Sequence, residues 1–372
     1  MSVLSYRILH TEASLGLGGQ EIRILTELAG LIGRNHQATL VCPPSSRIRD
    51  EALRMGLPAT ALPIGRKNLA GLRSMSAWLR HHPVDVVISH SSTDSWLTAL
   101  ATRFLHPRPF LIRVRHISTP VHDNLPTRWL YQKAAGHVIT TGECIRRQLI
   151  DQRGHPPERV TSIPTGIDLA RFTPGDRVAA RHQLGLPREP FLVGIVASMR
   201  DWKGHQILLE AFKAWARPDT RLVIVGEGDR WVEIKRRIAE LDLGELVFMP
   251  GNQADVAPWL QALDLFVLPS LANEGVPQVI LQAMACGLPV IGSAIGGIPE
   301  VIDHGMTGLL VPPGDVHALR QALVGLMDHP EQRLSLGLAA QRSATPRFGV
   351  EVMLDHTEEL LHSCLRQNKK SW

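Results

Sequence analysis

The sequence predicts an α/β fold made of two doubly wound, Rossmann-like domains. Short apolar runs alternate with helical patterns along the chain, which is typical of parallel strands covered by helices on both faces of a sheet. The alternation occurs in two series, and a stretch rich in turn residues separates them. A chain of 372 residues is long enough for two domains, each with its own core.

Seven strands are predicted in the first series. They fall at residues 7–10, 39–42, 59–62, 84–89, 110–114, 137–141 and 160–163. Helical patterns lie between them, so we expect a parallel sheet with helices on both faces. Turn residues in the segment Ile163-Pro-Thr-Gly-Ile-Asp168 and at Pro174 then end the series.

Six further strands are predicted in the second half, again with helices between them. They fall at residues 191–196, 221–225, 247–249, 265–268, 290–292 and 308–311. We therefore expect domains at residues 1–170 and 171–348, and a C-terminal helical segment at residues 349–372. Ligands of doubly wound folds bind outside the carboxyl ends of the strands, which predicts a site in a central cleft that both domains face.

Charge is shared unevenly along the chain. The net charge is +5, and residues 1–177 hold 22 Lys and Arg against 13 Asp and Glu. A basic first half and a mildly acidic second half indicate different partners for the two domains. An anionic membrane surface or an anionic acceptor fits the first domain, and we expect no nucleic-acid partner. Surface arginines without a specific partner are the alternative.

The cysteines and the first residues bear on the compartment. The four cysteines form no CxxC pair, which argues against a disulfide framework and a thiolate zinc site and favours a reducing compartment. The start of the chain lacks a cleavable signal pattern, and no apolar run reaches the roughly 20 residues that span a bilayer. We expect a cytoplasmic protein, with a peripheral location on the inner face of the membrane as an alternative.

Residues 64–82 are a candidate membrane contact. The segment combines Leu69, Leu72 and Leu79 with several basic side chains. A helix of this composition fits an anionic membrane surface. The alternative is that the same leucines face the protein's own core.

A carboxylate stands at the start of a predicted helix in the second domain. Glu274 follows an apolar strand and precedes Gly275 and Pro277, which suit a tight turn and a first helical position. A helix N-terminus carries roughly half a unit of positive charge and several unpaired N–H donors, so it suits a phosphate or a hydroxyl-rich ligand. An exposed acid in an ordinary strand-to-helix turn is the alternative.

A glycine-rich stretch follows the first strand and opens the first helix. In Gly16-Leu-Gly-Gly-Gln-Glu21 the small residues let a ligand come close to backbone N–H groups. The spacing lacks the third glycine of a dinucleotide fingerprint, and Val41-Cys42-Pro43 stands where its acid would be expected. A plain glycine turn is the alternative.

Lys203 comes shortly after the first strand of the second domain. It stands in Val196-Ala-Ser-Met-Arg-Asp-Trp-Lys-Gly204, which also holds Ser198 and Arg200. A surface lysine at a helix start runs against the preference of cations for helix C-termini. This favours a functional role for Lys203.

Two histidines follow strands of the first domain. His116 comes just after the strand at residues 110–114, and His90 after the strand at residues 84–89, so both lie where a doubly wound fold exposes residues. Several of the 17 histidines are expected to be structural. We take His90, with the neighbouring Arg113 and Arg115, as candidates for acceptor binding.

Metal binding is not predicted. The chain has no HExxH, no CxxC and no Asp-x-Asp placed after an apolar strand. Positive charge for an anionic ligand would therefore come from Lys203, Arg200 and helix N-termini.

The segment from residue 269 to 300 resembles the donor-binding signature of glycosyltransferase family 4, a retaining family of the two-domain GT-B architecture. The wider resemblance to this family is strongest from residue 193 to 313. That signature has Glu-Gly-x-Pro, a second Glu eight positions after the first, Ala-Met-Ala-x-Gly-x-Pro-Val and Gly-Gly-x-x-Glu. The resemblance extends over nearly the whole chain. The matching residues are Glu274, Gly275, Pro277, Ala283, Met284, Ala285, Gly287, Pro289, Val290, Gly296, Gly297 and Glu300.

The resemblance implies a GT-B fold whose last helix crosses back to the first domain, and a metal-independent, retaining transfer of sugar from a nucleoside diphosphate sugar to a hydroxyl acceptor. It implies no cofactor. A saccharide or lipid-linked acceptor of lipopolysaccharide, polysaccharide or glycolipid assembly fits the basic first domain. The implied catalytic residues are His116, Lys203 and Glu274. The implied donor-binding residues are Gly18, Gly19, Ser198, Arg200, Lys203, Glu274, Gly275, Val276, Pro277, Gln278 and Gln282.

Two positions depart from the family pattern. Gln282 replaces the second Glu, which in the family holds the ribose diol, and an amide accepts a weaker hydrogen bond than a carboxylate. Ser198 stands where the family usually has an Arg, and we expect Arg200 or the Ser198 hydroxyl to substitute in part. A sugar-nucleotide epimerase of similar fold, or a catalytically silent binding protein, is the alternative function.

Overall fold

The computed structural model describes residues 5–121 and 123–370 and divides the chain into two compact units. Unit 1 is Met1–Gly166 with Val350–Trp372, and unit 2 is Ile167–Gly349. The chain therefore passes between units at residues 166/167 and 349/350, where the sequence predicted 170/171 and 348/349. The difference at the first crossing arises because Ile167 N donates to Phe348 O at 2.7 Å and Ile167 is buried in the core of unit 2.

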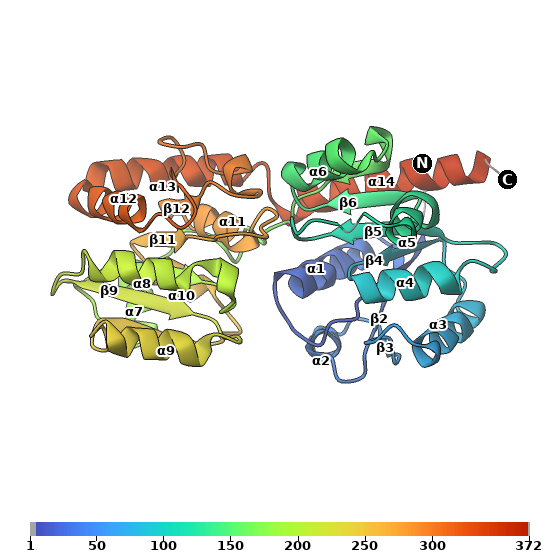
Figure 1. The fold of residues 1–372 in the computed structure, drawn as a ribbon, viewed down its shortest axis with the longest axis horizontal. Helices are drawn as coiled ribbons and strands as arrows, with labels where there is room; N and C mark the ends of the chain where they lie inside the picture. Colours follow the sequence, from blue (N-terminus) through green and yellow to red (C-terminus); the bar gives the residue numbers. More distant parts are fainter. Residues whose placement is uncertain (1–4, 122, 371–372) are drawn as a thin grey trace. The chain divides into compact units, whose positions relative to one another are not determined.

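Unit 1 holds a seven-stranded, all-parallel sheet in the order β3-β2-β1-β4-β5-β6-β7 (Figure 1). All seven predicted strands are present, with ends that differ by one or two residues. The order runs outward from β1 in both directions, as in a doubly wound fold. The strands are β1 (Arg7–Thr11), β2 (Gln37–Cys42), β3 (Ala59–Ala61), β4 (Val86–Ser89), β5 (Phe110–Arg115), β6 (His137–Thr140) and β7 (Val160–Ser162).

Helices cover both faces of this sheet, so unit 1 has two apolar clusters. Ile8 of β1 packs in one cluster with residues of α1 and α14, and Leu9 packs in the other. Successive strand residues point to opposite faces, which explains the division. The helices of unit 1 are α1 (Gly19–Gly33), α2 (Arg47–Arg54), α3 (Leu69–His81), α4 (Ser92–Ala101), α5 (Leu125–Trp129), α6 (Glu143–Arg153) and α14 (Val350–Lys370), with a π-helical turn at Leu130–Ala134.

Helix α3 holds most of the segment considered for membrane contact. Its Met75 and Leu79 are buried in the Leu9 cluster, and Leu72 packs against that cluster. Leu69 is 67% exposed. The apolar face of α3 is therefore mostly used by the unit's own core, as the alternative interpretation of this segment expected.

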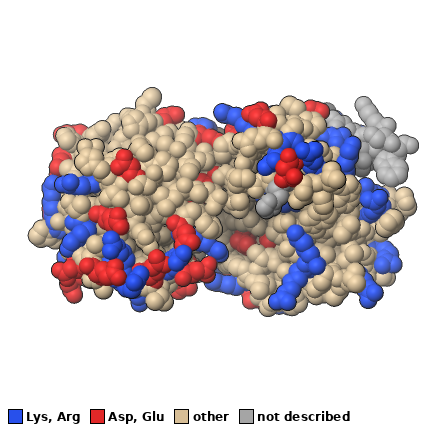
Figure 2. Space-filling view, in the orientation of Figure 1, with Lys and Arg blue, Asp and Glu red and all other residues tan. Residues whose placement is uncertain are grey.

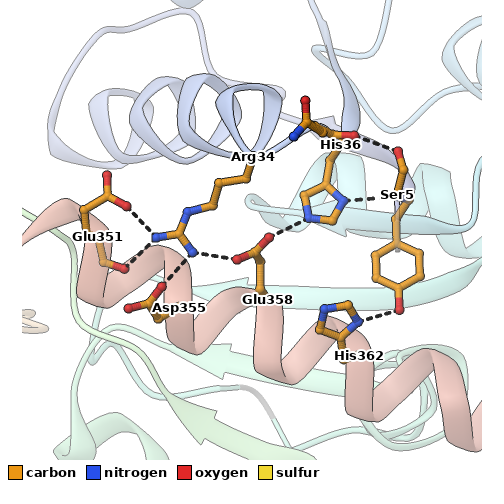
Figure 3. A network of polar contacts seen from close by, with 9 residues as sticks. Ser5, Arg34, His36, Glu351, Asp355, Glu358 and His362 are labelled. Carbon is orange, nitrogen blue, oxygen red and sulfur yellow. Dashed lines mark hydrogen bonds and ion pairs between the residues drawn. The ribbon is translucent and has the colours of Figure 1, made fainter. Parts of the chain in front are cut away.

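Polar contacts hold the last helix on unit 1 (Figure 3). The Arg34 guanidinium, just after α1, contacts Glu351, Asp355 and Glu358 of α14 at 2.5, 2.7 and 2.6 Å. His36 Nε2 lies 2.8 Å from the other oxygen of Glu358. These contacts join α14 to the N-terminal part of the chain, from which it is separated by the whole of unit 2 in sequence.

Unit 2 holds a six-stranded, all-parallel sheet in the order β10-β9-β8-β11-β12-β13 (Figure 1). All six predicted strands are present, and two of them have the predicted bounds. The strands are β8 (Phe191–Val196), β9 (Thr220–Val225), β10 (Val247–Gly251), β11 (Leu265–Leu268), β12 (Val290–Ser293) and β13 (Leu309–Val311). The helices are α7 (Arg177–Gln183), α8 (His205–Lys213), α9 (Trp231–Glu240), α10 (Ala257–Ala262), α11 (Gln278–Ala285), α12 (Val316–Asp328) and α13 (Pro330–Ala344).

In the described part of the chain, every helix is too short or too polar to span a bilayer.

Candidate active site

In unit 2, Glu274 and Lys203 form an ion pair at the carboxyl edge of the sheet. Lys203 Nζ lies 2.6 Å from Glu274 Oε1, and Ser270 Oγ donates to the same oxygen at 2.7 Å. The Glu274 side chain is 6% exposed and that of Lys203 is 17% exposed. The sequence singled out both residues but did not predict that they pair. The contact places a fixed positive charge beside a nearly buried carboxylate.

Close backbone packing brings the two loops together. Lys203 ends a short 3₁₀ turn after β8, and Gly204 follows it in the left-handed conformation, with φ of +74°. A Cβ at Gly204 would lie 1.9 Å from the carbonyl oxygen of Pro269, at the end of β11. Leu271 N also donates to Trp202 O at 2.7 Å. Glycine is therefore required at position 204 for the Lys203 loop to approach the Glu274 loop.

The Gly296-Gly297 pair packs directly on the backbone of the Glu274 loop. A Cβ at Gly296 would lie 2.3 Å from Glu274 O, and one at Gly297 would lie 2.6 Å from the carbonyl carbon of Gly275. Gly297 N also donates to Glu274 O at 3.3 Å. The absence of side chains at Gly296 and Gly297 therefore lets their loop pack against the backbone of the loop that carries Glu274.

Helix α11 begins slightly later than predicted. Its first residue is Gln278, and Pro277 is the extended residue that precedes the helix, with ψ of 120°. The placement of Pro277 at the first helical position was wrong, since its extended ψ leaves it outside the helix. Glu274 and Gly275 lie in the preceding turn, where Asn273 has a φ of +62°.

Gln282 lies in the second turn of α11. Its side chain is only 7% exposed, and it makes no hydrogen bond to any residue in the described part of the chain. Val276 is 6% exposed beside the same helix. The Gln282 amide therefore has its donors and its acceptor available for a ligand contact.

Ser198 and Arg200 lie on the exposed rim of unit 2, on the loop that leads to Lys203. The Arg200 guanidinium lies 3.5 Å from Asp229 and 5.7 Å from the centre of the Trp202 ring. Neither side chain forms a hydrogen bond or an ion pair with the Glu274 carboxylate, whose partners in the described part of the chain are Lys203 and Ser270. The structure therefore brings Lys203 to Glu274 and leaves Ser198 and Arg200 on the surface nearby.

In unit 1, three histidines meet at the carboxyl edge of the sheet. His10 Nδ1 lies 3.0 Å from His90 Nε2, and His90 Nδ1 lies 3.1 Å from His116 Nε2. The rings are stacked, with centroids 5.3 Å apart in both pairs. They come from β1 and from the residues just after β4 and β5. Sequence reasoning proposed His90 and His116 but missed His10, which lies in a strand that ends at the same edge.

Burial keeps these imidazoles neutral. His10 and His90 are buried, and burial lowers the pKa of each below its ordinary value. His116 is partly exposed by surface area, and burial of its ring lowers its pKa well below the ordinary value. Neutral imidazoles each have one N–H donor and one acceptor nitrogen. At neutral pH the histidines therefore act as hydrogen-bonding groups.

Asp94 fixes the turn that carries His90. Its carboxylate accepts the backbone N–H groups of His90 and Ser91 at 2.9 and 2.8 Å and the Thr11 hydroxyl at 2.8 Å. Burial raises the Asp94 pKa. These bonds determine where the chain places the His90 ring.

The glycine loop of unit 1 has room for a ligand. Gly18 precedes α1, and Gly19 is the first residue of that helix. A Cβ at Gly16 would meet nothing within 4 Å, and one at Gly18 would meet only Glu21, at 3.5 Å. Internal packing therefore does not explain Gly16 and Gly18, in contrast to Gly296 and Gly297.

A fully buried acid, Glu12, lies just after β1 near the glycine loop. It accepts the Ser14 N–H at 2.7 Å and a hydrogen bond from the Gln20 side chain. Burial, with the nearby charge of Asp94, raises the pKa of Glu12 to about 8. At neutral pH its carboxyl group is therefore largely protonated. Sequence reasoning missed Glu12, whose only signal was its position after β1.

The two arginines proposed for acceptor binding, Arg113 and Arg115, differ in how exposed they are. Arg113 is 6% exposed, and its guanidinium lies 4.2 Å from the centre of the Tyr131 ring. It lies inside β5 with its side chain buried, and its role in acceptor binding stays a prediction. Arg115 is partly exposed, and it donates to Thr119 O.

No group of three His, Cys, Asp or Glu side chains that could hold a metal ion occurs among residues 5–121 and 123–370.

The sign of the charged side chains differs between the two units on the face shown in Figure 2. Mainly basic side chains lie on unit 1, whereas acidic and basic side chains are mixed over α9, where Arg230 pairs with Glu233 at 2.5 Å.

Sequence profiles match both units. Residues 17–171 match "Glycosyltransferase Family 4", and residues 190–329 match "Glycosyl transferases group 1". The chain is 31% identical over 308 residues to the D-inositol 3-phosphate glycosyltransferase of Mycolicibacterium paratuberculosis, covering 77% of this chain and 68% of that protein. It is 34% identical over 214 residues to a GDP-mannose-dependent phosphatidylinositol monomannoside mannosyltransferase of Corynebacterium glutamicum, covering 54% and 55%. The chain spans about half the length of three further D-inositol 3-phosphate glycosyltransferases that it matches.

Solved structures share the fold over almost the whole chain. HepE of Anabaena, solved in complex with UDP-glucose, is 25% identical and superimposes with a TM-score of 0.86, covering 96% of this chain and 100% of that one. The lipopolysaccharide outer core galactosyltransferase WaaB is 18% identical, with a TM-score of 0.70 over 96% and 99% of the chains. Both units thus have the GT-B type of fold.

Proposed function

The chain belongs to glycosyltransferase family 4, and on this premise we propose that it transfers a sugar from a nucleoside diphosphate sugar to a hydroxyl acceptor. The observation that carries the proposal is the Lys203–Glu274 ion pair at the carboxyl edge of the unit 2 sheet, just before α11. This edge is where doubly wound folds bind nucleotides.

The chemistry at this edge fits departure of a diphosphate. Negative charge grows on the leaving diphosphate while the sugar takes on oxocarbenium character, so fixed positive groups aimed at the diphosphate lower the barrier. Lys203 and the backbone N–H groups at the start of α11 supply such groups. Gly18 and Gly19, with Ser198 and Arg200, would add further polar contacts to the donor.

Glu274 is proposed to hold hydroxyl groups of the donor sugar. Its Oε1 already accepts from Lys203 and Ser270, so an incoming sugar hydroxyl would meet an oriented carboxylate. We propose transfer with retention of configuration, as the family resemblance implies, with Glu274 as an orienting group and not a covalent nucleophile. His116 is proposed to contact the donor sugar from unit 1.

The acceptor is proposed to be a hydroxyl of a saccharide or of a lipid-linked precursor. Two observations support this class: the basic first half of the chain and the relatives whose names specify inositol phosphate or phosphatidylinositol mannoside acceptors. A role in polysaccharide, lipopolysaccharide or glycolipid assembly follows from such an acceptor. His90 and Arg115 remain proposed neighbours of that site.

We also propose peripheral contact with an anionic membrane on its cytoplasmic side. Its support in unit 1 is the exposed Leu69, with Phe104 and Leu125, which are 82% and 80% exposed, on a basic unit. Exposed apolar side chains among basic ones bind anionic bilayers. Sedimentation with phosphatidylglycerol vesicles, but not with phosphatidylcholine vesicles, would support this; equal recovery in the supernatant with both would refute it.

Direct measurement of donor turnover tests the proposed function. The purified protein is incubated with UDP-glucose and GDP-mannose, with and without a saccharide or lipid-linked acceptor, and release of nucleoside diphosphate is followed. Acceptor-dependent release is expected. Conversion of the donor sugar without release of diphosphate would indicate an epimerase, and no turnover of any bound donor would indicate a silent binding protein. Activity that is unchanged by a chelator is expected if Lys203 and α11 supply the positive charge.

A further inference from the structure

The three histidines of unit 1 form one continuous line of hydrogen bonds. His10 points to the same face of the sheet as Ile8, two positions earlier, which is the face that α1 covers. His90 uses both ring nitrogens, one toward His10 and one toward His116. The line therefore runs from a fully buried strand residue to His116, the partly exposed member.

The protons of the three neutral rings cannot be placed independently. A neutral imidazole has one N–H, so His90 can donate to His116 only if it accepts from His10, and the reverse. Two arrangements follow. In one, all three rings carry the proton on Nδ1; in the other, all three carry it on Nε2. The first makes the remaining nitrogen of His116, Nδ1, a donor, and the second makes it an acceptor.

The inner end of the line is surrounded by polar groups that α1 contributes. His10 Nε2 is buried and has no hydrogen-bond partner among the described residues. Glu27 and Arg23 of α1 exert the main charge effects on His10, and their side chains, both fully buried, lie 3.5 Å apart. Asp94 and Arg115 are the other charged groups near the line. The setting of His10 is thus electrostatically asymmetric, which favours one of the two arrangements.

We propose that His10 and His90 are positioning residues that fix which ring nitrogen of His116 carries the proton. The proposal rests on the proposed function, in which His116 contacts the donor sugar. A sugar hydroxyl can donate or accept, and a fixed tautomer makes His116 a defined partner for it.

A purely structural role does not account for the line. A buried polar atom without a partner costs free energy, so His10 Nε2 does not stabilise this core. On the same face of the sheet, Ile8 and Ile24 are fully buried in an apolar cluster. Retaining a histidine with an unpartnered nitrogen there is explained by what its other nitrogen does for His90.

Two amide substitutions at position 10 separate the hydrogen bond from the loss of the ring. The amide of Asn can take the place of Nδ1, which contacts His90, whereas the amide of Gln takes the place of Nε2, which does not. His10→Asn should therefore preserve the line and His10→Gln should break it. His137→Gln is the control for removal of a buried histidine, because His137 lies in β6 and contacts Thr161 instead. Thermal unfolding verifies that each variant is folded.

The first readout is nitrogen-15 NMR of histidine-labelled protein without ligand, which identifies the protonated ring nitrogen. In the wild type, His90 and His116 should carry the proton on the same ring nitrogen, either Nδ1 or Nε2. His10→Asn should show the same tautomers as the wild type. In His10→Gln, His116 should change to the other tautomer or to a mixture. Different tautomers on His90 and His116 in the wild type, or an unchanged His116 in a folded His10→Gln, would overturn the proposal.

The second readout is donor turnover with UDP-glucose. His10→Gln should lower kcat by at least about tenfold with little change in KM, whereas His10→Asn and His137→Gln should stay near wild type. If the tautomer changes in His10→Gln and kcat does not, the histidines do not position a reacting group and the proposal fails. If the wild type turns over no donor while the shared tautomer is observed, the proposed function fails and the coupling of the rings stands.

Discussion

The two units share a parallel, doubly wound fold but use different chemistry at the carboxyl edge of their sheets. Unit 1 presents neutral groups there: three hydrogen-bonded imidazoles and a buried carboxyl group, Glu12, whose pKa burial raises to about 8. Unit 2 presents an ion pair, in which Lys203 stays 17% exposed beside Glu274. The fold therefore determines where chemistry is placed, and local burial determines whether a charge is retained.

This difference predicts opposite effects for one substitution in the two units. Glu12→Gln should stabilise the protein at pH 7 by on the order of 3 kcal/mol. Glu12 is largely protonated at pH 7 in the folded state but ionised in the unfolded state, so its raised pKa destabilises the fold as pH rises from about 4.5 to about 8. Gln resembles the protonated acid and does not titrate.

Chemical denaturation of the wild type and Glu12→Gln at pH 4.5 and pH 7 measures this effect. The gain should vanish at pH 4.5, where Glu12 is protonated in the folded state and half-protonated in the unfolded state. The matched substitution in unit 2, Glu274→Gln, should destabilise the protein at pH 7, since it removes the partner of Lys203. A destabilising Glu12→Gln at pH 7 would contradict the assignment of neutral chemistry to unit 1.

Glu274→Ala should remove most sugar transfer while leaving the protein folded. Loss of one charge-assisted hydrogen bond in the transition state costs around 2–3 kcal/mol, which is some tens- to hundredfold in rate. Ser270→Ala is the matched control, because Ser270 contacts the same oxygen as a neutral donor and should cost less. Wild-type turnover in Glu274→Ala would refute the assignment of the site to unit 2.

Lys203→Met should weaken binding of UDP by about tenfold, or about 1.4 kcal/mol. Met keeps the length of the side chain and removes the charge that would meet the diphosphate. Arg200→Met, on the exposed rim, should have the smaller effect, since its guanidinium lies 3.5 Å from Asp229. Calorimetric titration of UDP gives both affinities. A larger loss in Arg200→Met would move the main phosphate contact from Lys203 to the rim.

Much of the fold could be predicted because each strand is a short apolar run and needs no long-range information to be found. The positions of Glu274, Lys203 and His116 at sheet edges followed from the same reasoning. Their pairing could not be predicted, because it depends on the close approach that Gly204 allows between loops after β8 and β11. The burial of Arg113 was also missed, since its neighbours in β5 are set by tertiary packing.

The smallest predicted effect concerns Gln282, the departure from the family signature in α11. The Gln282 side chain is 7% exposed, and among the described residues it has no hydrogen-bond partner. If the Gln282 side chain faces the ribose, Gln282→Glu should tighten binding of both UDP and UDP-glucose by on the order of 1 kcal/mol, because a carboxylate can accept from both ribose hydroxyls.

Without a diol partner, the new acid at position 282 would instead be a buried charge that destabilises the protein. Calorimetric titration of UDP and UDP-glucose, with thermal unfolding of both forms, distinguishes these results. Unchanged affinity for both ligands together with unchanged stability would mean that position 282 does not face the ribose, and the selectivity of unit 2 for its nucleotide would then depend on other residues of this edge.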